Sequence, residues 1–351
     1  MATDRPLRVA LAGYGLAGAV FHAALVAATP GLALTAVVTR DPTRRAQLAA
    51  DHPEARAVDA LEDALGEADL VVVASPNRFH HDLAAAALDA ACHVVVDKPL
   101  AVDATAAREL AGRADAARRM LAVFHNRRCD DDFLTLRRVV DEGRLGRVLR
   151  LESRFDRWRP AVREGAWREG GDPADGGGLL LDLGSHLADQ AVQLLGPVTA
   201  VYAELDRRRP GAQVEDDVFV ALHHAGGARS HLWAGVHAAH RAPRLRVLGD
   251  RAAFVSEGLD PQEAQLRAGM APDDPGFGRR DAAHSAAVLN GEGAHQPVAM
   301  ERGDWARFYV LVVAAIRDGA PPPVPAADAV AVLELLEAAR RSAATGTVVA
   351  L

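Results

Sequence analysis

The strongest constraint on this chain is a glycine-rich segment near its start, residues 13–18, with the sequence GYGLAG. It follows a strand-like run at 7–12 and opens an apolar helical stretch. In this context Gly13 permits the tight turn, Gly15 lets the backbone approach a pyrophosphate, and Gly18 lets helix and strand pack closely. The N–H groups of the helix N-terminus then face the phosphates. The segment predicts dinucleotide binding by Gly13, Tyr14, Gly15, Leu16 and Gly18.

The first third of the chain alternates strands with helices. Residues 70–74 form a continuous apolar run, which is typical of a parallel strand that is buried on both faces. Asp41 and Pro42 have the residue types of an N-cap and a first helical position. Further strands are predicted at 32–38, 93–96 and 120–124, and further helices at 78–91 and 103–118. Repeated βα units predict an α/β Rossmann domain with a doubly wound parallel sheet over residues 1–125.

After about residue 145 the pattern changes to strands without intervening helices. A glycine-rich loop at 170–178 precedes a helix from about 179 to 195, and residues 258–300 are rich in loops. Strands are predicted at 148–155, 198–206, 214–224, 228–236, 243–249 and 252–255. Such a run predicts an α+β domain with a large, mostly antiparallel open sheet, over residues 126–351. We expect the C-terminal helices, at about 304–343, to pack back on the Rossmann domain.

Composition favours a cytoplasmic enzyme. The net charge of -7 gives no sign of a nucleic acid or membrane partner, and no apolar run reaches the ~18 residues that a membrane helix needs. Cys92 and Cys129 cannot form a disulfide framework and are expected to be intracellular thiols.

Lys98 is the only lysine among 40 basic residues. It follows the strand 93–96, and the carboxyl ends of parallel strands are where open α/β sheets bind ligands. Arginine is a planar fork, whereas lysine is a compact point donor whose pKa can shift. A lone lysine at this edge therefore indicates a position where arginine fails. The alternative is that chance left one lysine in the chain.

The end of the second strand favours NADP over NAD. An NAD enzyme has an acidic residue there to accept from the ribose 2′-OH, but this chain has Thr39 and Arg40, which can bind a phosphate. Asp41 could supply the acid, although its place before Pro42 is better explained by helix capping. The alternative is that Arg40 is a solvated surface charge.

Two further groups of polar residues are candidates for chemistry. Asp182 and His186 are four residues apart on a predicted helix, so they share one face, and a histidine can exchange a proton near neutral pH. A surface Asp–His pair is the plain alternative, and no further ligand cluster supports a metal, so none is expected. Asn126, Arg127 and Arg159 follow strands and are candidate donors to substrate hydroxyls, unless they form a solvated face.

With these motifs assembled, the chain resembles the glucose-fructose oxidoreductase/inositol dehydrogenase (Gfo/Idh/MocA) family over nearly its whole length. The motifs that carry the resemblance are Gly13-x-Gly15-x-x-Gly18, Ser75-Pro76-Asn77-x-x-His80, Asp97-Lys98-Pro99 and Asp182-x-x-x-His186. It looks most similar to the NADP-dependent scyllo-inositol dehydrogenases of that family, through residues 124–128, 157–160 and 182–186.

The resemblance implies roles for individual residues. Lys98 would hydrogen-bond the reacting oxygen, His186 would be the general acid/base, and Asp182 would bind substrate and polarise His186. The implied cofactor-binding residues outside the glycine segment are Thr39, Arg40, Pro76, Asn77, His80, Asp97 and Lys98, with Asn77 and His80 near the nicotinamide and a cis Lys98–Pro99 peptide. Two positions depart from the family: Asp97 replaces its usual glutamate, and Cys129 stands where an aromatic residue is frequent.

The expected function is therefore NADP(H)-dependent interconversion of a polyol and its ketone, by a homo-oligomer, a dimer or tetramer, that assembles through the second-domain sheet. A dehydrogenase of aldoses or other sugars, with NAD possible as the cofactor, is an alternative within enzymes. A non-catalytic dinucleotide-binding regulator of the same fold is an alternative of another class. Joint retention of Lys98, Asp182 and His186 disfavours the regulator.

Lys98→Arg tests the lone lysine. The charge is kept, but a longer planar group cannot match a compact donor position, so we expect turnover to fall on the order of 10²-fold. Dinucleotide affinity, measured by fluorescence titration, should be largely kept because the phosphates rest on the glycine segment. Near-normal turnover would show that chance left this lysine in the chain.

Overall fold

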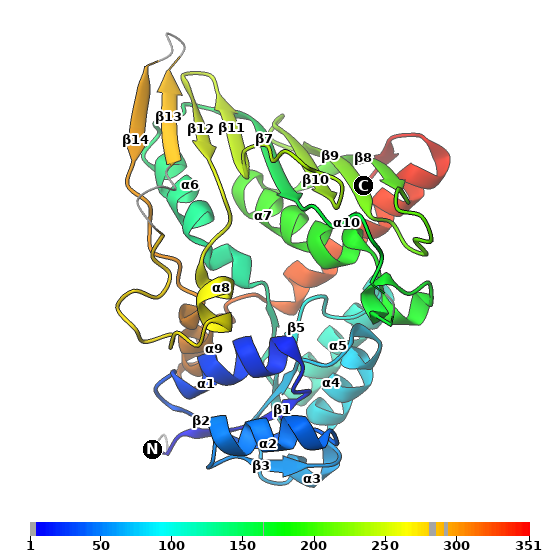
Figure 1. The fold of residues 1–351 in the computed structure, drawn as a ribbon, viewed down its shortest axis with the longest axis vertical. Helices are drawn as coiled ribbons and strands as arrows, with labels where there is room; N and C mark the ends of the chain where they lie inside the picture. The colour runs from blue at the N-terminus through cyan, green and yellow to red at the C-terminus, as the bar shows by residue number, and fades with distance from the viewer. Residues whose placement is uncertain (1–4, 164, 281–285, 291–293) are drawn as a thin grey trace. The chain divides into compact units, whose positions relative to one another are not determined.

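The computed structural model describes residues 5–163, 165–280, 286–290 and 294–351. It divides into two compact units. The first contains the chain up to Asn126, together with Gln262–Phe277 and Asp304–Val330. The second contains Arg127–Pro261, Gly278–Gly303 and Ala331–Leu351. The units are described one at a time below (Figure 1).

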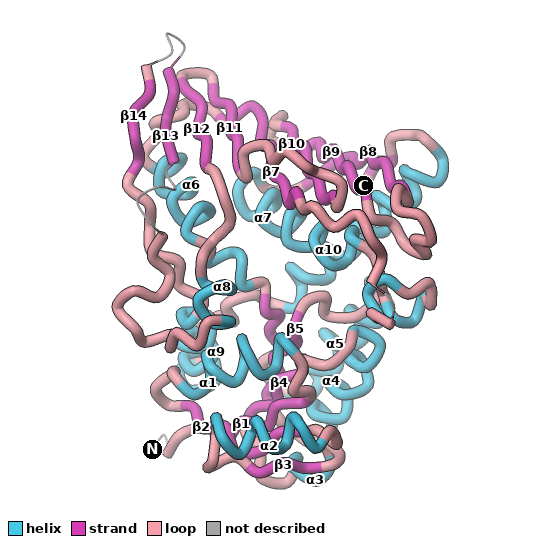
Figure 2. The backbone as a smooth tube through the Cα atoms, viewed as in Figure 1, coloured by secondary structure: helices cyan, strands magenta, loops and turns pink. Residues whose placement is uncertain are grey.

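The first unit is built on a parallel sheet, coloured as strands in Figure 2. Within the described residues its six strands have the order β3-β2-β1-β4-β5-β6, and each neighbouring pair is parallel. The strands are β1 (Leu7–Ala12), β2 (Leu32–Val38), β3 (Arg56–Val58), β4 (Leu70–Val73), β5 (His93–Asp97) and β6 (Leu121–Phe124). The order reverses between β1 and β4, which is the switch point where such sheets bind ligands. The predicted doubly wound sheet is confirmed.

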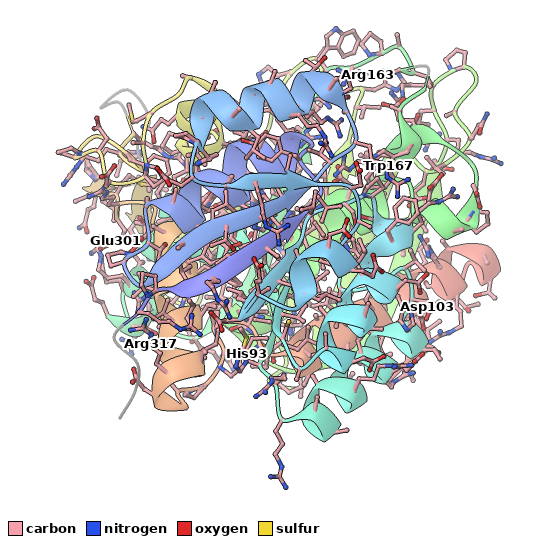
Figure 3. The ribbon with its side chains drawn as sticks, turned by 90° about the horizontal axis from the view of Figure 1, so that it is seen from below. His93, Asp103, Arg163, Trp167, Glu301 and Arg317 are labelled. Carbon is pink, nitrogen blue, oxygen red and sulfur yellow. The ribbon has the colours of Figure 1, made fainter. Side chains whose placement is uncertain are left out.

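Five described helices connect these strands: α1 (Ala24–Ala27), α2 (Pro42–Asp51), α3 (Glu62–Leu65), α4 (His80–Asp89) and α5 (Ala104–Ala117). Helices α8 (Gln262–Arg267) and α9 (Ala306–Asp318) come later in the chain and also belong to the first unit. Asp41 caps α2 as predicted, because its carboxylate accepts the N–H groups of Thr43 and Arg44. Asp103 caps α5 in the same way through the N–H of Ala106 (Figure 3).

The helix after the glycine segment differs from the expected regular α-helix. Ala17–Ala23 is a π-helical turn, and α1 adds only four residues. A π turn inserts one extra residue and so turns the side chains that follow it toward a different face. The short elements β3 and α3 were not predicted, because segments of three or four residues carry no readable periodicity.

The second unit holds a large sheet, which has nine strands in the described part of the chain, in the order β14-β13-β12-β11-β7-β10-β9-β8-β15. All neighbours are antiparallel except β7 and β10, so the predicted mostly antiparallel sheet is confirmed. The strands are β7 (Val148–Asp156), β8 (Val198–Asp206), β9 (Asp217–His224), β10 (Arg229–Gly235), β11 (Leu245–Gly249), β12 (Ala252–Ser256), β13 (Ala286–Asn290), β14 (His295–Val298) and β15 (Val349–Ala350).

Helices α6 (Asp131–Asp141) and α7 (Ser185–Leu195) lie on one face of this sheet (Figure 1). Alternation along β9 sets that face: Val218, Val220 and Leu222 are buried, and the residues between them are half-exposed. The last helix, α10 (Ala326–Thr345), begins in the first unit and continues in the second. The region expected to be loop-rich contains α8, β13 and β14, and α6 was not predicted. No described helix is long and apolar enough to span a membrane.

His93 at the start of β5 (Figure 3) makes the first unit sensitive to acid. Its Nδ1 accepts the N–H of Met120 at 3.0 Å, and burial, followed by the nearby Arg119 cation, lowers its pKa to about 4. Between this value and the ordinary ~6.5 the unfolded chain binds more protons than the folded one. Stability is therefore lost as pH falls through that window.

His93→Asn should weaken this dependence, because the amide oxygen can accept the same N–H and does not titrate. We expect a smaller drop in melting temperature between pH 7 and pH 5 than in wild type, with one proton worth at most ~1.4 kcal/mol per pH unit. His81→Asn is the control, because it removes a histidine whose pKa is raised in the folded protein and should therefore enlarge the drop in melting temperature between pH 7 and pH 5. Burial lowers the pKa of His81, but hydrogen bonds with Asp82 and Glu109 outweigh burial and raise it. Equal pH dependence in His93→Asn and wild type would contradict the assignment.

Candidate active site

The glycine segment joins β1 to the π turn, and its three glycines have different roles. Gly13 has φ +103°, and a Cβ there would lie 2.8 Å from the carbonyl oxygen of Ala74. A Cβ on Gly18 would lie 2.0 Å from the carbonyl oxygen of Gly13. Both glycines are therefore required by the fold itself. A Cβ on Gly15 would meet nothing within 4 Å, so the protein does not require a glycine there. The open space at Gly15 fits a phosphate group that approaches the backbone closely.

Tyr14 and Leu16 of this segment differ in how far their side chains are exposed. Tyr14 is only 2% exposed, and burial raises the pKa of its hydroxyl to about 12. Leu16 is 47% exposed. The Tyr14 ring is thus part of the core, and a contribution of Tyr14 to dinucleotide binding would come from its backbone.

The end of β2 is cationic. Arg40 is exposed, and its Nε donates to the carbonyl oxygen of Asp59 at 3.1 Å. Arg45 donates to the carbonyl oxygen of Thr39 at 2.9 Å and pairs with the Asp59 carboxylate at 2.7 Å. The carboxylate of Asp41 is occupied by the N-terminus of α2, so it serves as a cap, as its position before Pro42 suggested.

The turn after β5 carries the single lysine. The N–H of Lys98 donates to Asp97 Oδ1 at 2.8 Å, and the Lys98–Pro99 peptide is cis. His80 lies beside this turn, with Nδ1 2.7 Å from the carbonyl oxygen of Pro99 and Nε2 2.9 Å from that of Ser75. Both ring nitrogens of His80 thus face backbone carbonyl groups, so the ring ties the end of β5 to the end of β4. Asn77, in the turn Asn77–Phe79 just before α4, is buried.

Asp182 and His186 lie where a π turn, Leu180–Gly184, passes into α7. The simple α-helical spacing that the sequence suggested is therefore modified by one extra residue in the turn. Asp182 Oδ1 is 3.5 Å from Arg168 Nε, an ion pair that sequence reasoning did not identify. His186 is 5% exposed, and its ring centroid is 6.4 Å from that of Phe155.

Buried polar contacts hold α7 one turn beyond His186. Arg128 donates to both carboxylate oxygens of Asp189, at 2.9 Å for the Nε–Oδ2 pair. Gln190 donates to the carbonyl oxygen of Arg127 at 2.7 Å and accepts from Arg244 at 2.9 Å. Asp189 and Gln190 were not predicted, because a polar residue on an amphipathic helix gives no sign of the partner it will meet.

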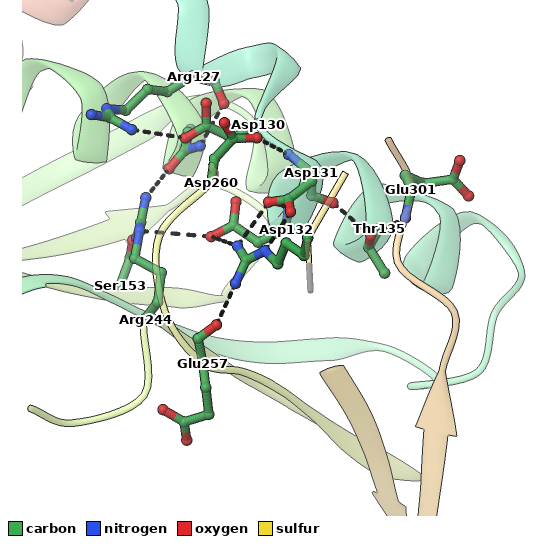
Figure 4. Close-up of polar contacts among 12 residues, drawn as sticks. Arg127, Asp130, Asp131, Asp132, Thr135, Ser153, Arg244, Glu257, Asp260 and Glu301 are labelled. Atoms are coloured by element: carbon green, nitrogen blue, oxygen red, sulfur yellow. Dashed lines mark hydrogen bonds and ion pairs between the residues drawn. The ribbon is translucent and has the colours of Figure 1, made fainter. Parts of the chain in front are cut away.

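The predicted substrate residues lie in different environments. The Arg127 guanidinium is buried, donates to Asp130 at 3.0 Å and lies 4.9 Å from the ring centroid of Phe155 (Figure 4). Asn126, two residues after the end of β6, is buried. Arg159 is exposed, and its backbone N–H donates to the carbonyl oxygen of Val236 at 2.8 Å. The substrate roles of Asn126, Arg127 and Arg159 therefore stay predictions.

Around Arg127 a set of buried charges ties α6 to the loops of the second unit (Figure 4). Arg280 pairs with Asp131 at 2.7 Å, and the Asp131 backbone N–H donates to the Asp260 carboxylate at 2.8 Å. Burial raises the pKa of Asp131, and the Arg280 cation opposes that effect. These residues pair with one another within one unit, which is a structural role. In the described residues no group of three or more His, Cys, Asp or Glu side chains could hold a metal ion.

Comparison with known proteins agrees with this architecture. A family model described as "Oxidoreductase family, NAD-binding Rossmann fold" matches residues 7–125, and one described as "GFO/IDH/MocA C-terminal domain" matches residues 133–255. The oxidoreductase YdgJ of Escherichia coli (strain K12) is 40% identical over 96% of both chains. The scyllo-inositol 2-dehydrogenase (NADP(+)) IolW of Bacillus subtilis (strain 168) is 31% identical over 96% of this chain and 93% of its own.

Solved structures agree as well. The oxidoreductase yvaA from Bacillus subtilis superimposes with a TM-score of 0.95 at 29% identity, and the match covers 100% of each chain. Two family models, full-length relatives and a matching structure lead to the same assignment. The chain belongs to the Gfo/Idh/MocA family of oxidoreductases, with an NAD-binding Rossmann fold as its first part.

Proposed function

We propose that this protein is an NADP(H)-dependent dehydrogenase that interconverts a polyol, of the scyllo-inositol-like cyclitol class, and its ketone. The observation that carries the cofactor choice is the end of β2, where Arg40 is exposed and the Asp41 carboxylate is used as a helix cap. An exposed cation here suits a 2′-phosphate, because the nearby carboxylates are engaged, Asp41 by the helix and Asp59 by Arg45. The NADP(+)-dependent relative IolW supports both the cofactor and the substrate class.

Three residues are proposed to carry the reaction. A bound nicotinamide would supply the hydride acceptor or donor. In the oxidative direction His186 accepts the proton of the substrate hydroxyl. The hydride leaves the carbon that bears this hydroxyl, so that a ketone forms. Lys98 donates a hydrogen bond to the reacting oxygen, and Asp182 binds substrate and orients His186. Placing Lys98 and His186 at one substrate carbon rests on the sequence resemblance.

The remaining predicted residues have supporting roles in this proposal. The glycine segment binds the pyrophosphate, Pro76 and Asn77 line the nicotinamide end, and Asn126, Arg127 and Arg159 contribute to the polyol site. The sugar-dehydrogenase alternative differs from this proposal in the polyol site and allows NAD as the cofactor. We also propose that the protein is a homo-oligomer that associates through the second-domain sheet, whose half-exposed face carries Phe219 and Trp233, with ring centroids 5.2 Å apart.

The direct test is a panel of cyclitols and aldoses, each measured with NADP and NAD. We expect the highest kcat/KM with a cyclitol and NADP. Arg40→Asp should lose the 2′-phosphate partner and gain an acid beside the ribose, and a charged hydrogen bond is worth about 1.5–3 kcal/mol, so the NADP/NAD ratio should fall about tenfold or more. Arg118→Asp is the matched control. Arg118 is an exposed residue in the left-handed region, where aspartate is tolerated.

A wild type that prefers NAD would overturn the role of Arg40. Preference for aldoses over every cyclitol would replace the substrate class. The absence of turnover with any member of the panel, together with measurable dinucleotide binding, would favour the regulator.

Gly15→Ala separates cofactor binding from folding. Because the added Cβ meets nothing within 4 Å, the melting temperature should stay at the wild-type value, while dinucleotide binding weakens about tenfold or more. Gly66→Ala is the control, since its Cβ also meets nothing within 4 Å and the residue follows α3, outside the glycine segment. Gly18→Ala should instead lower the melting temperature, because its Cβ would overlap the Gly13 carbonyl group. Unchanged dinucleotide affinity in Gly15→Ala would contradict phosphate binding at this segment.

A further inference from the structure

A fully buried histidine in the first unit faces two polar groups that the mechanism above does not use. His22 lies in the π turn Ala17–Ala23 and is 0% exposed. Its Nδ1 is 2.6 Å from the hydroxyl oxygen of Tyr309, on α9. Its Nε2 is 4.0 Å from Asp97 Oδ1, at the end of β5. The ring therefore stands between a buried phenol and the carboxylate that precedes Lys98.

The environment of the ring determines where its proton is. Burial, and then the Asp97 charge, raise the pKa of Tyr309 well above its usual value, so the phenol stays protonated. Burial also lowers the pKa of His22 to about 4; the Asp97 charge raises this pKa, and His80 lowers it. His22 is therefore neutral at neutral pH and carries one ring proton. Because Tyr309 can donate to Nδ1, that proton belongs on Nε2, where the N–H faces Asp97; the other tautomer would set a lone pair against a carboxylate.

Packing fixes the ring in this position. The ring of Phe124 lies 4.5 Å from that of His22, and the ring of Tyr309 meets it edge-on at 6.1 Å and 88°. Among the described residues the buried Nε2 has no hydrogen-bond partner. Nδ1 is the partner of the buried Tyr309 hydroxyl, which an apolar side chain at residue 22 would leave unpaired. The Tyr309 contact uses only Nδ1, so the N–H at Nε2 is explained by its electrostatic contact with Asp97.

The carboxylate that faces His22 also contacts the backbone of the proposed catalytic lysine, Lys98. The Asp97 oxygen that faces His22, Oδ1, is the one that accepts the N–H of Lys98 at 2.8 Å. We propose that His22, oriented by Tyr309, is a positioning residue that holds the Asp97 carboxylate and, through it, the Asp97-Lys98-Pro99 turn. This inference rests on the proposed function, because it takes its catalytic consequence from Lys98. His80 holds the same turn at the carbonyl group of Pro99.

Two amide variants of His22 test the contacts of its two ring nitrogens separately. The amide of Gln reaches the place of Nε2, and the amide of Asn reaches the place of Nδ1. His22→Gln can therefore still donate to Asp97, whereas His22→Asn can only meet Tyr309. We expect His22→Asn to lower kcat about tenfold, with KM for polyol and the Kd of NADPH within about twofold of wild type, and His22→Gln to stay within about threefold in kcat.

Asp97→Asn provides the coupling test. If His22 acts through Asp97, adding His22→Asn to Asp97→Asn should lower kcat by less than about twofold further. Tyr309→Phe keeps the ring and removes only the hydroxyl, so it tests the same chain of contacts if His22→Asn fails to fold. Tyr309→Phe should lower kcat by about threefold. Full additivity of His22→Asn and Asp97→Asn, or wild-type kcat in both His22→Asn and Tyr309→Phe, would overturn the inference.

A readout that does not depend on turnover is the tautomer of His22. In ¹⁵N-histidine-labelled protein at pH 6, with the His22 signal assigned by its loss in His22→Gln, Nε2 should be protonated and Nδ1 should be a hydrogen-bond acceptor. Tyr309→Phe should shift the Nδ1 signal. A proton on Nδ1 in wild type would overturn the inference while leaving the proposed function intact. Near-normal turnover of Lys98→Arg would instead overturn the proposed function, and the catalytic consequence drawn here with it, even if the tautomer is as expected.

Discussion

The approach of two backbones at the start of the chain determines most of what the first unit can do. A Cβ on Gly18 would lie 2.0 Å from the Gly13 carbonyl oxygen, so the helix can lie this close to β1 only because residue 18 has no side chain. This approach aims the unpaired N–H groups of the helix at the space in front of Gly15, and the same helix begins as a π turn that directs His22 inward. The proposed phosphate binding and the proposed support of the Asp97 carboxylate therefore depend on one packing contact.

In the second unit, buried charges rather than a close approach of two backbones fix the orientation of α7. The Arg128–Asp189 pair has side-chain exposures of 12% and 2%, and removing one partner of such a pair costs about 3–5 kcal/mol, mostly for the charge left behind. A pair whose arginine is exposed, such as Arg5–Asp69, is screened by water and contributes much less to stability. The orientation of α7, which carries His186, is therefore set by the few ion pairs that are out of water.

The sequence predicted the parts of the fold that local patterns encode. The parallel strands are continuous apolar runs, Asp41 and Pro42 mark a helix start, and the glycine spacing identifies the dinucleotide turn, so these features were found. The π turns at 17–23 and 180–184 were not, because a single inserted residue leaves the apolar periodicity nearly unchanged. The partners of buried polar residues were also missed: Arg168 with Asp182, Arg128 with Asp189 and Tyr309 with His22 join positions that are 14, 61 and 287 residues apart.

The chain has 39 arginines and one lysine among its 40 basic residues, and its buried arginines use the shape of the guanidinium group. Arg128 and Arg280 each reach a buried carboxylate through two nitrogens, a fork geometry that a lysine ammonium cannot reproduce. Arginine thus serves wherever a cation must be paired inside the protein. The turn after β5 differs, because the Asp97 carboxylate there accepts the backbone N–H of Lys98 and faces the His22 ring. A compact, rotatable donor suits that position, and Lys98 is the residue found there.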